Sequence, residues 1–284
     1  MKVGIICNKK NKTINRISEE LEKLGHECYR LYLKDFIFSI ENNENFTISH
    51  RKKEINDIDI FFFKFNTDNH SLQSILEFIE SRNKKVINGQ NTTYLTNFYL
   101  FHALVRNHIK VINLYHTAGL RAARDVLIDL EHPIMILPFE GKETRAEISD
   151  DWTESFDVVK SEKIKIFDFL EIPENIYKTG TYNTSIIVNN KIIFNAEVST
   201  KDKLLWASTL KKYKTIEPTE TTVNQLQNIM SLLELDICQI DFYIDENSNE
   251  IIVLNISLFP SIYSIENKFK VNLAREIAEF IVSK

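Results

Sequence analysis

The residues with the clearest chemical potential lie near the C-terminus, in the stretch "DICQIDFYIDENSNEIIVLNISLFPSI" (236–262). One carboxylate, Asp241, sits on an apolar run, and two neutral oxygen-bearing side chains, Asn255 and Ser257, sit on the next. Magnesium prefers hard oxygen ligands, carboxylates above all. One carboxylate with two neutral partners predicts a weak cation site or the remnant of one.

The sequence lacks the common patterns for phosphate loops, zinc and disulfides. Backbone N–H groups approach a phosphate most closely where several glycines lie together. The chain has six glycines in all and no GxGxxG or Walker-type window. Its three cysteines lie far apart and its seven histidines do not cluster, which predicts neither a zinc site nor a disulfide framework.

The composition is that of an ordinary globular chain. Its 284 residues are 43% hydrophobic and 26% charged, with a net charge of -5. An acidic balance disfavours a nucleic-acid partner. The first apolar run has about five residues, too short for a secretory signal, and no stretch reaches the roughly 18 apolar residues of a membrane span. We therefore expect a cytoplasmic protein with no membrane contact.

The elements that must position these side chains begin with an alternation of strand and helix over residues 1–91. Apolar runs predict strands at 2–7, 26–33, 57–65 and 85–88. Helical spacing predicts helices between them, at 13–25 and 71–83. Strands separated by single helices predict a parallel sheet with helices on its faces.

From residue 92 onward the pattern changes to mixed α+β. A helix is predicted at 94–109, an extended segment at 110–113 and a second helix at 119–130. Strands are predicted at 133–141, 146–152 and 164–172, and a hairpin at 181–198 with its turn at Asn189 and Asn190. The remaining expected elements are a helix at 222–235, strands at 238–245 and 250–257, and a helix at 272–284.

Several phrases in this order resemble the ATP-grasp superfamily, especially ligases related to ribosomal S6 glutamate ligase and glutathione synthetase. They are "KKVINGQNTTYLTNFYLFHALVRNHIKVIN", "HPIMILPFEG", "IFDFLEI" and "CQIDFYIDENSNEIIVLNISLFPSI". The resemblance covers nearly the full chain. It implies an N-terminal pre-ATP-grasp α/β domain (1–91), a small ATP-grasp lobe (92–170) and a C-terminal lobe (171–284).

The resemblance also implies a chemistry. ATP would lie between two antiparallel sheets, with magnesium on its phosphates, and a carboxylate would be phosphorylated so that an amine can attack the acyl phosphate. The family's two phosphate-binding lysines fall on Asn97 and Leu137, and its arginine falls on Thr184. Its metal ligands Asp, Glu and Asn fall on Asp241, Asn255 and Ser257. Its glycine-rich loop keeps only Gly141.

Two roles stay open for the residues that match. The backbone of Phe169 and Leu170 is expected to meet an adenine, or to form an ordinary strand between lobes. Asp168 and Glu171 are expected at a ribose hydroxyl or in solvent, and Glu140 and Lys142 beside the nucleotide. Asp241 either keeps a cation role or is a strand-end carboxylate hydrogen-bonded to its neighbours, with Asn255 as a weak ligand or a buried, hydrogen-bonded amide.

The leading hypothesis is a divergent ATP-grasp protein with a degraded nucleotide and magnesium site, weakly active or a non-catalytic binding module. The alternative is an active ATP-dependent carboxylate–amine ligase, in which Lys142, Arg145 or Lys191 converges on Asp241 and Glu140. ATP and magnesium are expected only if the protein is active. The partner is expected to be a small molecule, peptide or protein, and the oligomeric state stays open. The lysine-rich segment 199–218 is expected to be a solvated loop rather than a region that contacts substrate.

Overall fold

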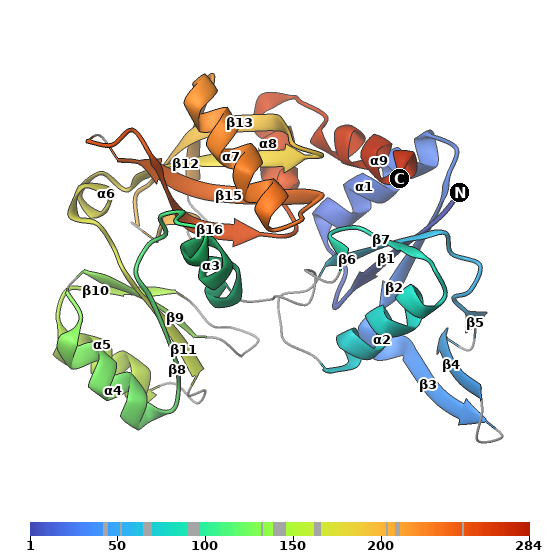
Figure 1. The fold of residues 1–284 in the computed structure, drawn as a ribbon, viewed down its shortest axis with the longest axis horizontal. Helices are drawn as coiled ribbons and strands as arrows, with labels where there is room; N and C mark the ends of the chain where they lie inside the picture. The colour runs from blue at the N-terminus through green and yellow to red at the C-terminus, as the bar shows by residue number, and fades with distance from the viewer. Residues whose placement is uncertain are drawn as a thin grey trace.

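The computed structural model describes residues 1–41, 45–51, 53–64, 70–89, 97–131, 133–138, 146–161, 166–202, 204–207, 211–245 and 247–284. They form a parallel sheet, two larger antiparallel sheets and a small three-stranded sheet, with helices packed on their faces (Figure 1). Among the residues assigned from sequence, Glu140, Gly141, Lys142 and Arg145 lie outside these ranges, as does the side chain of Asn97.

The N-terminal sheet is parallel, as predicted, with the order β2-β1-β6-β7. Its strands are β1 (Lys2–Cys7), β2 (Glu27–Tyr32), β6 (Ile60–Lys64) and β7 (Lys85–Val86). Helix α1 (Lys12–Lys23) packs on one face with the core of Val3 and Ile5, whereas α2 (His70–Ser81) packs on the other with Ile6 and Phe61. The two helices therefore lie on opposite sides of the sheet (Figure 1).

A three-stranded antiparallel sheet extends this domain between β2 and β6 and was not predicted. It consists of β3 (Phe36–Glu41), β4 (Asn45–His50) and β5 (Lys53–Glu54), after the short 3-10 helix η1 (Leu33–Asp35). Much of its apolar surface stays exposed, as at Ile40, 74% exposed. A strand pair without a clean buried face has a weak period-two signal in the sequence.

A four-stranded antiparallel sheet, order β10-β9-β11-β8, forms the small lobe at the lower left of Figure 1. Its strands are β8 (Leu114–Ala118), β9 (Ile134–Pro138), β10 (Glu147–Ser149) and β11 (Ile166–Glu171), and α4 (Leu120–Asp129) and α5 (Trp152–Ser161) cover one face. The predicted strand at 146–152 is too long. It ends at Ser149 because the Asp151 carboxylate accepts from Thr153 N at 2.8 Å and begins α5.

The C-terminal lobe is built on a five-stranded antiparallel sheet, order β14-β13-β12-β15-β16. The strands are β12 (Thr181–Val188), β13 (Lys191–Thr200), β14 (Lys211–Thr215), β15 (Ile237–Ile244) and β16 (Ile251–Ser257). The predicted hairpin is confirmed, since Asn189 and Asn190 turn it with φ of 50° and 62°. The expectation of a solvated loop is wrong for residues 211–215, because they pair with β13 as an edge strand.

The remaining helices connect and cover these sheets. They are α3 (Asn97–Arg106), α6 (Glu174–Thr179), α7 (Glu220–Leu232), α8 (Ile262–Phe269) and α9 (Leu273–Ser283), with the short 3-10 helix η3 (Leu205–Ala207). Gly180 ends α6 at a φ of 63°, and a Cβ there would meet the carbonyl oxygen of Thr200 at 2.4 Å, so only glycine fits. None of the described helices is long and apolar enough to cross a membrane.

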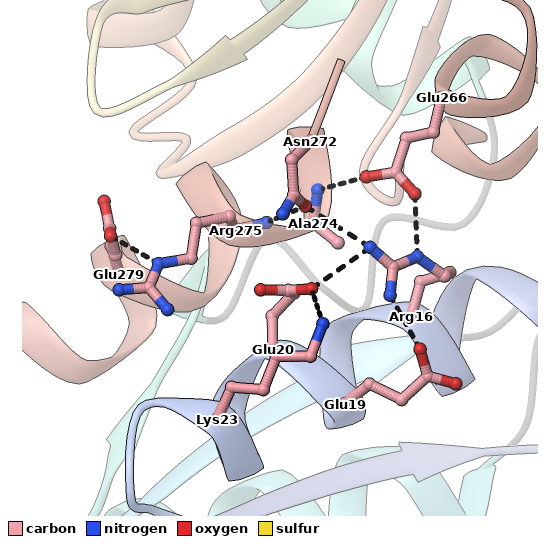
Figure 2. A network of polar contacts seen from close by, with 9 residues as sticks. All are labelled: Arg16, Glu19, Glu20, Lys23, Glu266, Asn272, Ala274, Arg275 and Glu279. Atoms are coloured by element: carbon pink, nitrogen blue, oxygen red, sulfur yellow. Dashed lines mark hydrogen bonds and ion pairs between the residues drawn. The ribbon is translucent and has the colours of Figure 1, made fainter. Parts of the chain in front are cut away.

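A polar network joins the N-terminal domain to the C-terminal helices (Figure 2). The Arg16 guanidinium of α1 donates to Glu266 of α8 at 3.1 Å and to Glu20 of its own helix at 3.1 Å. Glu266 also accepts from the backbone N–H of Ala274 in α9 at 2.8 Å. Glu20 and Glu266 are only 2% and 7% exposed, so their charges need a cation; Arg16 pairs with both, and Lys23 also pairs with Glu20 at 2.8 Å.

A second junction is made by one buried amide, that of Asn88 just after β7. Its Oδ1 accepts from the backbone N–H of Asp236 at 2.8 Å and of Ile237 at 2.9 Å. Its Nδ2 donates to the carbonyl oxygens of Ile237 at 2.9 Å and Leu258 at 3.3 Å. One side chain thereby holds the N-terminal domain against the end of the β15–β16 pair where β15 begins and β16 ends.

Candidate functional site

The C-terminal wall of the candidate site is a row of three side chains across neighbouring strands. Thr184 of β12, Asp241 of β15 and Asn255 of β16 are direct partners in the strand register. The strand neighbours of Asp241, Ile240 and Phe242, belong to the core that includes residues of α7. Because side chains alternate along a strand, Asp241 points to the opposite face of the sheet.

The Asp241 carboxylate is fully buried and accepts three hydrogen bonds from neutral side chains. Thr184 Oγ1 donates to Oδ1 at 2.6 Å, and Gln239 Nε2 donates to the same oxygen at 3.0 Å. Asn255 Nδ2 donates to Oδ2 at 2.8 Å. An ionised carboxylate only accepts, so each neighbour has to present a donor to it.

This arrangement does not fit a magnesium ion. Three of the roughly four lone-pair positions of the Asp241 carboxylate are already used. Asn255, at the family's glutamate position, turns its amide nitrogen rather than its oxygen toward Asp241. Ser257 donates to the carbonyl oxygen of Phe259 at 3.0 Å. Within the described residues, no group of three or more His, Cys, Asp or Glu side chains gathers as a metal site.

A lysine lies on the same face as Asp241, from edge strand β14. The β13–β14 and β12–β13 registers place Lys211, two residues from Tyr213, on this face. Burial lowers the pKa of Lys211, whereas the charges of Asp241 and Asp202 raise it in part. Burial and the charge of Asp241 raise the pKa of Tyr213 to about 12. Lys211 is thus a cation whose pKa depends on the charge of Asp241.

The small-lobe wall has a second row centred on an aspartate. His116 of β8, Asp168 of β11 and Leu137 of β9 are direct partners in the register. Phe167 and Phe169 pack against the core of α4 and α5, so Asp168 points to the other face. His116 Nδ1 and Asp168 Oδ1 are 2.7 Å apart. Burial raises the pKa of Asp168, although His116 opposes that rise.

The end of β11 and the segment that follows it, together residues 169–173 and called the hinge below, include the other residues assigned to a nucleotide. Strand β11 is paired on both sides, so the backbone of Phe169 and Leu170 takes part in the sheet. The Glu171 carboxylate accepts from Asn113 Nδ2 at 2.6 Å and from the backbone N–H of Glu131 at 3.0 Å. Asp168 and Glu171 therefore both have protein partners here, and their contact with a ribose remains a prediction.

A cavity of about 1070 Å³ lies beside this hinge. Its lining includes Glu171, Pro173, Tyr177, Tyr243 and Ile252, which come from the hinge, α6 and the β15–β16 pair. Neither aspartate row lines it. This cavity and the two rows are thus separate features of the structure.

The structure therefore brings the sequence-assigned residues together only in part. Thr184, Asp241 and Asn255 form one row, and Asp168 and Leu137 belong to another. Lys191 pairs with Glu276 at 3.2 Å and does not converge on Asp241. Three contributors were missed, namely Gln239, His116 and Lys211. The period-two spacing of Gln239 and Asp241 in "CQIDFYID" is the signal that could have identified the first.

Comparisons with known proteins find relatives by structure. No family model matches the chain, and no curated protein matches it. The macrocyclase MdnC from Microcystis aeruginosa MRC, solved with precursor peptide MdnA, is similar with a TM-score of 0.70 and 15% identity over 100% of both chains. A RimK-domain ATP-grasp protein from Sphaerobacter thermophilus matches with a TM-score of 0.70 and 13% identity, over 99% of this chain and 100% of that one.

A third similar structure is the ATP-grasp ligase PsnB, complexed with a phosphomimetic variant of its minimal precursor, Mg and ADP. It has a TM-score of 0.70 and 13% identity, and the match covers 99% of this chain and 97% of that one. These likenesses extend over whole chains, while the identities are low. The predicted fold is confirmed, and the chain has the fold of the ATP-grasp ligases.

Proposed function

We propose that this chain is a divergent ATP-grasp protein whose ligase chemistry is lost or strongly reduced, and that it acts as a binding module for a peptide. The observation that carries the proposal is the closed hydrogen-bonding of Asp241 by Thr184, Gln239 and Asn255. A magnesium ion would have to displace these donors while gaining only one charged ligand. Each displaced donor left buried would cost about 1–3 kcal/mol.

The phosphate side of the site supports the same proposal. Leu137, at the family's lysine position, is partly buried and packs against the core shared with the C-terminal lobe. An apolar side chain provides no compensation for the charge of a triphosphate. The neighbouring His116 is already engaged with Asp168. Peptides are the proposed ligand class because several structural neighbours are solved with precursor peptides.

Calorimetry with Mg-ATP tests the proposal. We expect no magnesium-dependent heat from the wild type at millimolar nucleotide. The matched variant Leu137→Lys/Asn255→Glu/Ser257→Asn restores one of the family's lysines and its two missing metal ligands and should gain binding, which a further Asp241→Ala change should remove. Micromolar, magnesium-dependent binding by the wild type that is lost in Asp241→Ala contradicts the proposal.

An active ATP-dependent carboxylate–amine ligase is the second candidate, and Lys211 is the observation that favours it. This lysine is partly buried on the Asp241 face and feels the charges of Asp241 and Asp202. Its ammonium could contact the ATP phosphates in place of the family's lysines, which this chain lacks. Trapping an acyl phosphate with hydroxylamine, in the presence of Mg-ATP and a glutamate-bearing peptide, tests this candidate. Hydroxamate formed by the wild type but not by Lys211→Met supports it.

A further inference from the structure

The N-terminal sheet contains a position at which α/β sheets commonly bind ligands. The chain leaves β1 through α1 toward β2 on one side, and it leaves β6 through α2 toward β7 on the other. The strand order therefore reverses between β1 and β6. Ligands of open α/β sheets bind outside the carboxyl ends of the strands at such a switch point. Cys7 and Lys64 end these two strands and are direct partners in the register.

Four lysines gather around this edge of the sheet. Lys9 and Lys10 are exposed in the loop after β1, Lys12 opens α1, and Lys64 ends β6. Within the described residues, none of the four forms an ion pair with a carboxylate. The whole chain carries a net charge of -5, so this edge is a local cationic excess on an acidic protein.

Lys64 is the central group of this cluster because it is partly buried. Its Nζ lies 4.1 Å from the centre of the Phe259 ring. Burial lowers the pKa of Lys64 to about 8, and the neighbouring Cys7 raises it slightly. The ammonium thus remains largely protonated at neutral pH, at a cost in free energy that an aromatic ring offsets only in part. An anion from outside the chain would offset the rest.

The C-terminal lobe supplies the opposite side of the lysine edge. Phe259, just after β16, stacks on Phe62 of β6 with ring centres 4.8 Å apart. Lys12 lies over the Tyr263 ring of α8 at 4.8 Å. The Arg16 and Glu266 contact described above holds α1 and α8 together beside this edge (Figure 2). The cations are therefore presented from a fixed junction of two lobes.

We propose that this lysine edge, formed by Lys9, Lys10, Lys12 and Lys64, binds a peptide segment that carries two or more carboxylates. The inference rests on the proposed function in taking the ligand to be a peptide. A phosphate group fits less well because the loop at residues 8–11 has no glycine to let backbone N–H groups close around it. The Asn11 side chain also occupies the Thr13 N–H at the start of α1, at 2.8 Å.

Fluorescence anisotropy with a labelled hexaglutamate peptide tests this site on the full chain, with hexaglutamine as the uncharged probe. We expect hexaglutamate to bind and hexaglutamine not to bind, and we expect the affinity for hexaglutamate to fall as salt is added. Lys64→Met should weaken binding by about tenfold or more, since a charge-assisted contact is lost. Lys10→Glu should weaken it by about two- to fivefold, because this lysine is exposed.

Lys53→Glu is the matched control, since Lys53 is an exposed lysine of the same domain on strand β5. It should change the affinity by less than Lys10→Glu does. Equal binding of hexaglutamate and hexaglutamine, or equal losses in Lys53→Glu and Lys10→Glu, overturns the proposal. Inorganic pyrophosphate that displaces the peptide with higher affinity than hexaglutamate itself also overturns it. None of these three results depends on Mg-ATP, so failure here is distinct from failure of the proposed function.

Discussion

Asp241 and Lys64 are two buried or partly buried charged groups that differ in how far the protein compensates their charge. The carboxylate of Asp241 is fully buried and receives three hydrogen bonds from its own sheet. The ammonium of Lys64 is partly buried and contacts an aromatic ring, with no ion pair to a described carboxylate. The first charge is satisfied within the fold. The second is left for the proposed external partner, and this difference separates the Asp241 site, which we propose to be closed, from the proposed lysine site, which is open.

The contrast also teaches where such a protein can keep function. A metal site no longer binds its ion well when neutral hydrogen-bond donors replace its charged ligands. The same donors, however, satisfy the remaining carboxylate, which can then stay buried in the core. Lys64, by contrast, has only the Phe259 ring as partial internal compensation. A cost in stability without an internal gain is typical of a binding site.

The largest expected effect is that of Asp241→Ala on folding. The change leaves the donors of Thr184, Gln239 and Asn255 without their acceptor in a buried site, so we expect a loss of about 3–5 kcal/mol in the free energy of unfolding. Urea denaturation measures it. A loss below about 1 kcal/mol would mean that the carboxylate is not part of the core's hydrogen bonding.

Next in size is Arg16→Met, which removes the cation between α1 and α8. Glu266 would keep a buried charge without a cation, and Glu20 would keep only Lys23 as its partner, so we expect a loss of about 2–4 kcal/mol in the free energy of unfolding at neutral pH, measured by urea denaturation. Burial opposes the shift, but hydrogen bonds from Lys23 and Arg16 lower the pKa of Glu20 below its usual 4.5. The difference from the wild type should therefore hold above about pH 4.5 and fade as the pH falls through the lowered pKa. A stability difference between variant and wild type that does not change with pH would contradict this expectation.

The opposite sign is expected for Lys64→Met. Its pKa is lowered from 10.5 to about 8 in the folded protein, so the charged lysine destabilises the fold at neutral pH. We expect the variant to be more stable by about 1–3 kcal/mol at pH 7, an advantage that shrinks as the pH rises from about 8 toward 10.5. Thermal melts across this range measure it. A destabilised variant at pH 7 would show that Lys64 is satisfied internally, as Asp241 is.

The smallest effect should come from His116→Ala. The imidazole is partly exposed and contributes one hydrogen bond to Asp168, at 2.7 Å. Its loss should cost about 0.5–1.5 kcal/mol and raise the pKa of Asp168 further above its usual value. Carboxyl titration by NMR measures the pKa. A lowered pKa of Asp168 would contradict the placement of His116 as its stabilising partner.

Most of the fold could be predicted because apolar periodicity reflects which faces are buried. The parallel strands β1, β2 and β6 and the β12–β13 hairpin follow this signal closely. Edge strands carried less information. Strand β14 has the sequence "KKYKT", whose alternate lysines resemble a solvated loop, and its strand state depends on pairing with β13.

The candidate site was predictable only where a motif fixed positions. Asp241, Asn255 and Leu137 could be placed by resemblance, but the state of the Asp241 carboxylate could not, because it depends on Gln239 and on the register of β12. In the sequence, Lys64 lies within the apolar run that predicts a strand at 57–65, and nothing there marks it as a binding residue. Lys64 can be recognised as a candidate binding residue only in the folded protein, where β1 and β6 lie side by side and Phe259, far away in the sequence, contacts the lysine.

The most direct test of the contrast is calorimetry on one wild-type sample, titrated first with Mg-ATP and then, in a separate run, with hexaglutamate. A closed Asp241 site and an open lysine edge predict heat from the peptide and no magnesium-dependent heat from the nucleotide. The reverse result, with saturable magnesium-dependent binding of ATP and none of the peptide, would contradict both halves of the account.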